Sequence, residues 1–264
     1  MFSIPKLSKA TRAMTMAWYC SGSTNTELIE NLFKAGLIQN ERVKDAMIGV
    51  SILCIYISIF SNMQKVDRAH YAPSRPYSDS PQPIGYGATI SAPHMHGHAC
   101  EYLINYLNPG ARVLDIGSGS GYLTHVLANL VTDSNTQGQV IGIDHISELT
   151  ELARTNMDKS KKGSEFQAST TVKFITGDGR LGWKEGAPYD AIHVGAAADQ
   201  LHPTLVDQLR APGRLFIPVE SEDESTGLNG GQYIWVVDKG EDGSIHKEKV
   251  FQVRYVPLTD APRG

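Results

Sequence analysis

Residues 111–124 read ARVLDIGSGSGYLT, and this stretch decides the fold. An apolar run typical of a buried strand leads through Asp115 into a glycine-rich turn, Gly117-Ser118-Gly119-Ser120-Gly121, and a helical pattern follows. Closely spaced glycines at a strand end allow the backbone to approach a ligand. Tyr122 stands where a dinucleotide fingerprint needs its third small residue, and no Lys-Ser/Thr pair follows. The turn therefore predicts a nucleotide-like ligand without a bound phosphate.

Strand and helix patterns alternate along the chain after this turn. The expected strands are 111–117, 139–144, 171–178, 189–195 and 214–219, and the expected helices are 122–131, 146–159 and 203–209. Residues 232–239 and 249–258 alternate around a turn at 240–244 and predict antiparallel strands at the end of the chain. Thr26–Ala46 has apolar residues at helical spacing and predicts a small N-terminal helical cap. Repeated βα units predict a doubly wound, mostly parallel α/β sheet that binds its ligand at the strand carboxyl ends.

The composition indicates an ordinary globular enzyme or binding protein. The chain has 264 residues, 41% hydrophobic content and a net charge of −4, which give no basic face for nucleic acid. We expect a single domain over residues 17–264. Three cysteines without metal or redox spacing favour reduced thiols and a cytoplasmic location. Residues 1–16, with three basic residues and no acidic one, predict a disordered leader, the alternative being an organelle-targeting peptide.

Residues 50–65 form an atypical apolar insertion. No charge stands between Asp45 and Lys65, which reaches the length of a membrane span, but serine, asparagine and glutamine dilute the apolar run. We therefore expect no membrane interaction. A retained intron or misplaced exon boundary explains the segment, and the alternative is a true insertion that lengthens a helix or forms an exposed apolar patch.

Three consecutive predicted strands end in aspartate. Asp115 before the glycine turn suits a cationic group, Asp144 can accept both hydroxyls of a ribose, and Asp178 can accept a hydrogen bond from an adenine amino group. Each aspartate alone could equally be a helix N-cap or a turn residue. A ligand with a cationic end, a ribose and a base accounts for all three, and S-adenosylmethionine is such a ligand.

At this point the chain resembles the protein-L-isoaspartate (D-aspartate) O-methyltransferase family. The resemblance covers about residues 17–260. It rests on DSPQPIGYGATISAPHMH (79–96), LDIGSGSGYLT (114–124), VIGIDHI (140–146), GDGR (177–180), APYDAIHVGAAA (187–198) and YVPLTD (255–260). It implies a Rossmann-like methyltransferase, with S-adenosylmethionine as cofactor, that repairs proteins by methylating the free carboxylate of L-isoaspartyl and D-aspartyl residues. Its implied partners are isoaspartyl-containing peptides and proteins, and we expect a monomer.

The resemblance also assigns roles to individual residues. It places the active-site serine at Ser91 and the substrate peptide near His193, Val194 and Gly195. The implied cofactor contacts are Asp115 and the glycine turn (Gly117, Ser118, Gly119, Ser120 and Gly121), together with Ala88, Thr89, Ile90, His96, Asp144, His145, Asp178, Gly179 and Thr259. The strand-end position of His193 is also compatible with a purely structural histidine.

Methyl transfer to a carboxylate needs little acid–base chemistry. A carboxyl group with a pKa of about 4 is already ionised at neutral pH, so Ser91 is expected to orient it as a hydrogen-bond donor rather than act as a nucleophile. The nearby run His94-Met-His96-Gly-His98 could suggest zinc, but Pro93 interrupts the strand pattern and no local Cys or carboxylate joins it. We expect no metal.

Two alternatives remain open at this stage. The chain could methylate another carboxylate or a small molecule, which would require no peptide groove around Ser91 and His193. It could also be a catalytically impaired adenosyl-binding or interaction protein, with residues 50–65 as a docking segment. Cofactor binding without turnover would identify the second alternative.

Overall fold

The computed structural model describes residues 20–49, 66–220 and 231–258. Residues 1–16, the insertion at 50–65 and Thr259 lie outside these described residues, so the expectations for them stay predictions. Within the described residues, no helix combines the length and the apolar character that crossing a membrane requires.

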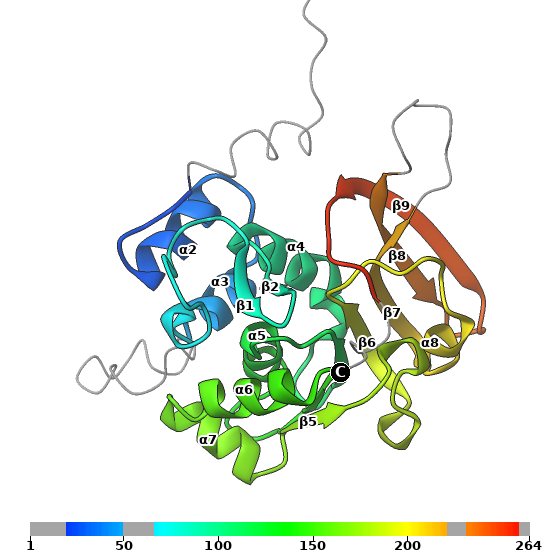
Figure 1. Cartoon of the computed structure of the whole chain (residues 1–264). Coiled ribbons are helices and arrows are strands. Elements are labelled where there is room, and N and C mark those ends of the chain that lie inside the picture. Colours follow the sequence, from blue (N-terminus) through cyan, green and yellow to red (C-terminus); the bar gives the residue numbers. More distant parts are fainter. Residues whose placement is uncertain (1–19, 50–65, 221–230, 259–264) are drawn as a thin grey trace, which may run out of the picture.

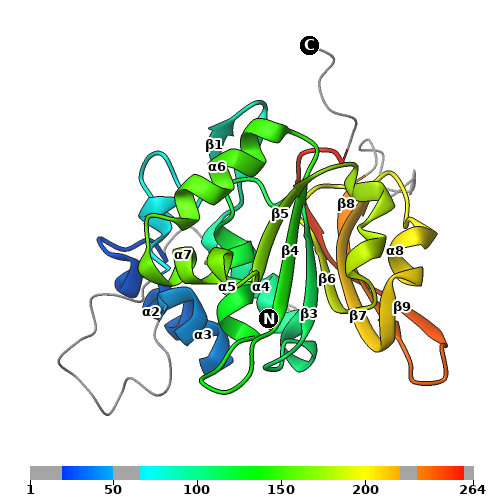
Figure 2. The same cartoon turned by 90° about the horizontal axis from the view of Figure 1, so that it is seen from below.

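A seven-stranded sheet runs through the centre of the molecule (Figure 1; Figure 2). Its strand order is β5-β4-β3-β6-β7-β8-β9. The strands are β3 (Arg112–Ile116), β4 (Gln139–Asp144), β5 (Val172–Thr176), β6 (Tyr189–Val194), β7 (Leu209–Glu220), β8 (Gln232–Lys239) and β9 (Ile245–Val253). The pairs from β5 to β7 are parallel, whereas β8 pairs antiparallel with both β7 and β9. The predicted doubly wound sheet with antiparallel C-terminal strands is confirmed.

The last strand differs from its predicted range. β9 begins at Ile245, before the predicted start at Lys249, and its pairing with β8 runs from Lys239↔Ile245 to Gln232↔Val253. Residues 246–249 are charged or polar, so they lack the alternation of apolar and polar residues that predicts a strand. Charged residues are common on an edge strand because they discourage pairing with other chains. Residues 254–258 leave the strand and reach the ligand pocket described below.

Helices cover both faces of the sheet, with most of them on one side (Figure 2). That side carries α2 (Asn25–Lys34), α3 (Glu41–Ile48), α4 (Pro93–Leu103), α5 (Tyr122–Leu130), α6 (Ser147–Met157) and α7 (Lys161–Ala168), and the other carries α8 (Pro203–Asp207). Short 3-10 turns occur at Arg68–His70, Ile104–Tyr106, Gly179–Leu181 and Lys184–Gly186. A separate hairpin of β1 (Gln82–Gly85) and β2 (Ala88–Ile90) precedes α4.

The N-terminal helical cap consists of two helices rather than one continuous helical segment. Thr24 caps α2 by accepting a hydrogen bond from the Glu27 amide, and Asn40 caps α3 through the Arg42 amide. Gly36, with φ of +74°, lies between them in a backbone conformation that favours glycine. Helix α7 was not predicted, because its sequence KKGSEFQA has only one large apolar residue.

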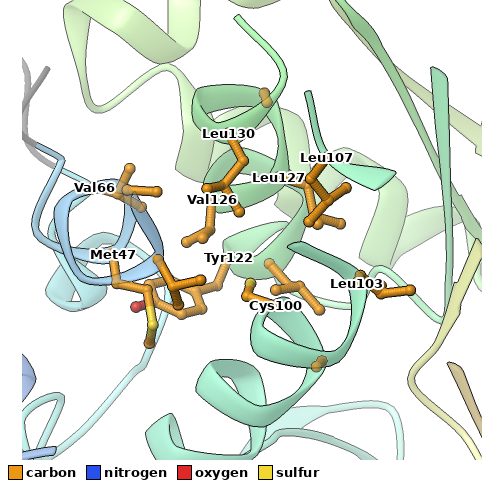
Figure 3. Packing of buried hydrophobic residues seen from close by; sticks show 14 of the residues in the cluster. Met47, Val66, Cys100, Leu103, Leu107, Tyr122, Val126, Leu127 and Leu130 are labelled. Carbon is orange, nitrogen blue, oxygen red and sulfur yellow. The ribbon is translucent and has the colours of Figure 1, made fainter. Parts of the chain in front are cut away.

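Alternation along the strands separates two hydrophobic cores. Val113 and Ala191 face the core under α2–α7, which we call the first core, whereas Leu114 and Ile192 face the core under α8, the second core. In the first core, Met47 of α3, Cys100 of α4 and Tyr122 of α5 lie among apolar side chains from the three helices (Figure 3). This packing holds α3, α4 and α5 together in the first core.

Candidate functional site

A cavity of about 330 Å³ opens at the carboxyl edge of the parallel strands. Such an edge, where the chain leaves β3 between its neighbours β4 and β6, is the usual ligand site of doubly wound sheets. The cavity is lined by Tyr86, Gly87, Ala88, Thr89, Ile116, Gly117, Gly119, Ile143, Asp144, His145, Ile146, Leu149, Gly179, Gly195, Ala196, Val256, Pro257 and Leu258. Its volume falls within the range of small-molecule sites, roughly 300–1,000 Å³.

The glycine turn after β3 forms one wall of this cavity. Gly117 and Gly119 have φ angles of +72° and +51°, which favour glycine. A Cβ added at Gly117 would lie 3.5 Å from the backbone carbon of Gly195, and one at Gly119 would lie 3.2 Å from Ile84 Cδ1. The chain therefore presents bare backbone to a ligand where side chains would narrow the space.

Asp144 supplies the carboxylate of the cavity wall. Its Oδ2 accepts a hydrogen bond from the Gly119 amide at 3.0 Å, and its Oδ1 accepts one from the Ile146 amide at 3.1 Å. Burial raises the pKa of Asp144, and these backbone hydrogen bonds oppose that rise. Each oxygen keeps acceptor capacity, so the fixed carboxylate can receive the two hydroxyls of a ribose.

The other two strand-end aspartates do not converge on the cavity. Asp178 caps the following 3-10 turn and pairs with Arg180, its Oδ2 lying 2.7 Å from Nη2, while the neighbouring Gly179 lines the cavity. The Arg180 hydrogen bond lowers the pKa of Asp178. Asp115 is 1% exposed and faces the first core, because residue alternation in β3 turns it away from the pocket. The sequence predicts that Asp115 contacts a cationic group of the ligand, but Asp115 is not among the residues that line the cavity.

Asp115 instead joins β3 to β6 and α5 through hydrogen bonds. Its Oδ1 lies 2.8 Å from His193 Nδ1, and its Oδ2 accepts a hydrogen bond from Thr124 Oγ1 at 2.6 Å. Asp115 and His193 are register partners on adjacent parallel strands, and the His193 ring stacks on Phe216. The imidazole that the family resemblance places near the substrate peptide is therefore held by a buried carboxylate.

Ser91 follows β2 and is partly exposed at the start of α4. Its carbonyl oxygen accepts a hydrogen bond from Arg68 Nη2 at 2.8 Å, and its side chain lies close enough to the Tyr255 phenol to affect the pKa of that group. Burial raises the pKa of Tyr255, which keeps the phenol neutral, while the contact with Ser91 partly opposes this rise. Ser91 is thus held between a buried arginine and the C-terminal segment.

The three histidines after Ser91 have separate roles. His94 Nδ1 lies 2.8 Å from the Asp79 carboxylate, whose same oxygen accepts the His94 amide at 3.0 Å. His96 is buried beside Arg68 and Tyr122, and burial lowers its pKa well below the ordinary value. Burial lowers the pKa of His98 to about 4. The described residues contain no group of three or more His, Cys, Asp or Glu arranged to hold a metal.

The remaining predicted residues either line the cavity or lie behind its wall. Ala88, Thr89, His145, Gly179 and Gly195 line the cavity together with the glycine turn and Asp144. Other predicted residues lie behind its wall. Those residues are Ile90, His96, Ser118, Ser120 and Val194, all of them buried. Gly121 is the N-cap residue of α5, where a Cβ would lie 3.0 Å from the Ala153 Cβ.

Several residues of the site were not assigned from the sequence. Tyr86 lies at the tip of the β1–β2 hairpin, is 57% exposed and lines the cavity. Tyr255 belongs to the YVPLTD motif, from which only Thr259 received a role. Arg68 lies just after the insertion and carries no motif signal of its own. The local sequence signal for Tyr86 is its place between Gly85 and Gly87, and in the structure all three residues have a positive φ.

Comparisons with known proteins agree with this geometry. A family model described as Protein-L-isoaspartate(D-aspartate) O-methyltransferase matches residues 55–263. A protein-L-isoaspartate O-methyltransferase of Caenorhabditis elegans is 46% identical over 244 residues, covering 92% of this chain and 96% of the relative. The protein-L-isoaspartate O-methyltransferase 1 of Arabidopsis thaliana is 43% identical over 237 residues, covering 89% of this chain and 91% of the relative.

A solved structure from Plasmodium falciparum has a similar fold. It is described as a protein-L-isoaspartate O-methyltransferase in complex with S-adenosyl-L-homocysteine. The two chains share a TM-score of 0.75 and 32% sequence identity, and the match covers 90% of this chain and 99% of that one.

Proposed function

This chain belongs to the protein-L-isoaspartate(D-aspartate) O-methyltransferase family, and we propose that the cavity at the strand carboxyl ends is where it binds its cofactor, S-adenosylmethionine. The protein is a carboxyl methyltransferase that acts on the free carboxylate of L-isoaspartyl and D-aspartyl residues in damaged proteins. The single observation that carries the site assignment is the Asp144 carboxylate, which is fixed by a hydrogen bond from the bare glycine turn and lines the cavity with it.

The cavity fits the cofactor by volume and by the chemistry of its walls. Asp144 would hold the ribose hydroxyls, and Ile143, Ile146 and Leu149 would contact the adenine ring. Backbone at Gly117, Gly119 and Gly195 would accept the close approach of the amino-acid portion. When bound, the cofactor supplies an electrophilic methyl group on a positively charged sulfur.

Ser91 would orient the substrate carboxylate. An isoaspartyl carboxylate with a pKa of about 4 is ionised at neutral pH, so no residue has to remove a proton from it. The Ser91 hydroxyl, restrained by its contact with Tyr255, would donate a hydrogen bond to one carboxylate oxygen and leave the other free to react. His193, fixed by Asp115, would border the same peptide site.

The finer properties of the enzyme also remain proposals. A single methyltransferase domain is supported by the one seven-stranded sheet that strands β3 to β9 form, and the monomeric state is an expectation carried over from the family resemblance. A cytoplasmic location is supported by three cysteines without disulfide-like spacing, which suit a reducing compartment. Size-exclusion chromatography with light scattering would test the monomeric state. Fluorescent tagging of the protein in cells would test the cytoplasmic location.

The function is tested by transfer of labelled methyl from S-adenosylmethionine to one peptide in isoaspartyl and aspartyl forms. We expect methylation of the isoaspartyl form alone. Ser91→Ala should lower kcat by about 100-fold, the usual cost of losing a positioned hydrogen-bond donor, while cofactor binding stays unchanged. Equal methylation of both peptides would overturn the assigned substrate specificity. Full activity of Ser91→Ala would overturn the role assigned to Ser91.

The same assay decides the status of residues 50–65. The full chain and a version without this segment should be compared under identical conditions. Activity of both would show that the segment is tolerated, and activity of the shortened chain alone would show that it blocks the enzyme. If neither is active but both bind the cofactor, the substrate assignment fails.

A further inference from the structure

Arg68 is an unusual buried cation. Its side chain is 0% exposed, and among the described residues no carboxylate lies within ion-pair distance of it. Its polar contacts are the Ser91 carbonyl oxygen at 2.8 Å from Nη2 and His96 Nδ1 at 3.4 Å from Nη1. Its Cζ lies 5.1 Å from the centroid of the Tyr122 ring, and its Nε has no hydrogen-bond partner among the described residues.

The charge of Arg68 persists despite this burial. Burial lowers the pKa of Arg68 to about 10, so the guanidinium is still protonated at neutral pH. Its polar neighbours are neutral, since burial lowers the pKa of His96 and raises the pKa of Tyr122. Asp79, the acidic residue with an electrostatic effect on Arg68, is hydrogen bonded to His94. One positive charge therefore lies behind Ser91 without a carboxylate in direct contact, and Asp79 offsets it only from a distance.

Such a charge is expensive for the fold. An unpaired buried ion loses its hydration without regaining it from a partner, and apolar replacements of similar shape often leave a protein as stable or more stable. A cation–π contact with Tyr122 and a carbonyl hydrogen bond recover only part of that cost. Because the guanidinium directly contacts the Ser91 backbone, an anion that arrives at Ser91 would add a second, closer negative charge to the distant one of Asp79.

We propose that Arg68 is a positioning residue that anchors the Ser91 segment and supplies the positive charge by which the enzyme selects an ionised substrate carboxylate. This inference rests on the proposed function, in which that carboxylate lies against Ser91. Charge interactions weaken slowly with distance in a protein interior, so Arg68 can act on the anion through the intervening Ser91 without touching it.

The test compares binding of two peptides that differ only in charge. One carries the free isoaspartyl carboxylate, and the other has that group replaced by a primary carboxamide. Calorimetry in the presence of S-adenosylhomocysteine measures both affinities without turnover. We expect the wild-type chain to bind the carboxylate peptide at least about tenfold more tightly.

Two variants separate charge from hydrogen bonding. Arg68→Gln keeps an amide that can donate to the Ser91 carbonyl but removes the charge, and it should reduce the preference to less than about threefold. Arg68→Lys keeps the charge and should retain most of the preference, even if both peptides bind more weakly. Thermal unfolding and cofactor binding establish that each variant is folded.

The outcomes distinguish this inference from the proposed function. Equal weakening of both peptides by Arg68→Gln, with the preference intact, would show a structural role alone and overturn the inference. Equal binding of the two peptides by the wild-type chain would overturn it even if Arg68→Gln failed to fold. A wild-type chain that shows the charge preference but transfers no methyl group would refute the proposed function, while a loss of that preference in Arg68→Gln would still show that Arg68 selects the carboxylate peptide.

Discussion

The two faces of the central sheet differ in the kind of residue they bury. The face under α8 packs aliphatic side chains such as Leu114, Ile192 and Leu205 into the second core. On the opposite face, the same strands place Asp115 and His193 beside the first core, where Arg68 and His96 are also buried. Because side chains alternate along a strand, one short sequence can serve both faces.

The difference indicates that the two faces have different roles, one mainly in stability and the other also in the reaction. Aliphatic packing stabilises a fold without any directional demand, whereas each buried polar group needs a partner in a fixed direction. The polar groups of the first face lead toward Ser91, through Arg68 and His96, and toward the substrate side, through His193. Changes on the apolar face should therefore affect stability, and changes on the polar face should affect the reaction as well.

The largest expected effect is a loss of stability on the apolar face. Leu205→Ala truncates a side chain that is 0% exposed in the second core and should lower the free energy of unfolding by about 2–5 kcal/mol. Denaturant unfolding measures this loss. At a temperature where the variant is folded, its kcat and KM should match the wild type, and a tenfold fall in kcat would break the comparison.

The next effect is a loss of activity on the polar face. Asp115→Asn keeps the shape of the side chain but removes the charge and leaves one acceptor oxygen where His193 and Thr124 now have two. We expect kcat/KM for an isoaspartyl peptide to fall by about tenfold to 100-fold, because a displaced group loses its productive geometry. Steady-state kinetics provide the measurement, and unchanged kinetics would show that His193 needs no orientation.

A pH-dependent effect should also belong to the polar face. Burial lowers the pKa of His125, which accepts the Tyr71 hydroxyl at 2.6 Å, from 6.5 to about 3. The unfolded chain binds this proton more readily, so the stabilisation is present above about pH 6.5 and is lost as the pH falls toward 3. One such group contributes a slope of about 1.4 kcal/mol per pH unit.

His125→Asn should make that slope shallower. Asparagine can still accept the Tyr71 hydroxyl but does not titrate in this range. Denaturant unfolding from about pH 4 to about pH 6.5 gives the slope of the free energy of unfolding for both proteins. This interval lies inside the window of about 3 to 6.5 in which His125 should contribute. If both proteins lose stability at the same rate, the buried histidine is not responsible.

The smallest effect sharpens the comparison within the polar face. Thr124→Val removes the hydrogen bond of 2.6 Å to Asp115 while leaving the contact between Asp115 and His193 in place. Stability should fall by about 1 kcal/mol, and kcat/KM should stay within about threefold of the wild type. A loss of activity as large as that of Asp115→Asn would mean that Thr124, not only Asp115, holds His193.

The sheet and part of the site could be predicted because their signals are local. The glycine turn, the strand ending in Asp144 and the alternating tail each appear within a few consecutive residues. The cavity wall at Gly117, Gly119 and Asp144 follows from these signals and the rule for strand carboxyl ends. Helix α7 could not be predicted this way, because its largely polar sequence leaves no apolar stripe.

The supporting groups depend on contacts between distant parts of the chain. Asp115 reads as a pocket residue in sequence, but its partner His193 lies 78 residues away and its orientation depends on strand phase. Arg68 reaches the Ser91 carbonyl across 23 residues, and Tyr255 approaches Ser91 from the C-terminal segment. No local pattern encodes which buried polar groups meet, so these contacts could not be predicted from the sequence.

The different roles of the two faces are tested most directly by one pair of single-turnover rates. Leu205→Ala and Asp115→Asn should be compared with the wild type, each folded and saturated with S-adenosylmethionine and an isoaspartyl peptide. We predict that Leu205→Ala transfers methyl at the wild-type rate and that Asp115→Asn is at least about tenfold slower. A wild-type rate for Asp115→Asn together with a slow Leu205→Ala would contradict the account.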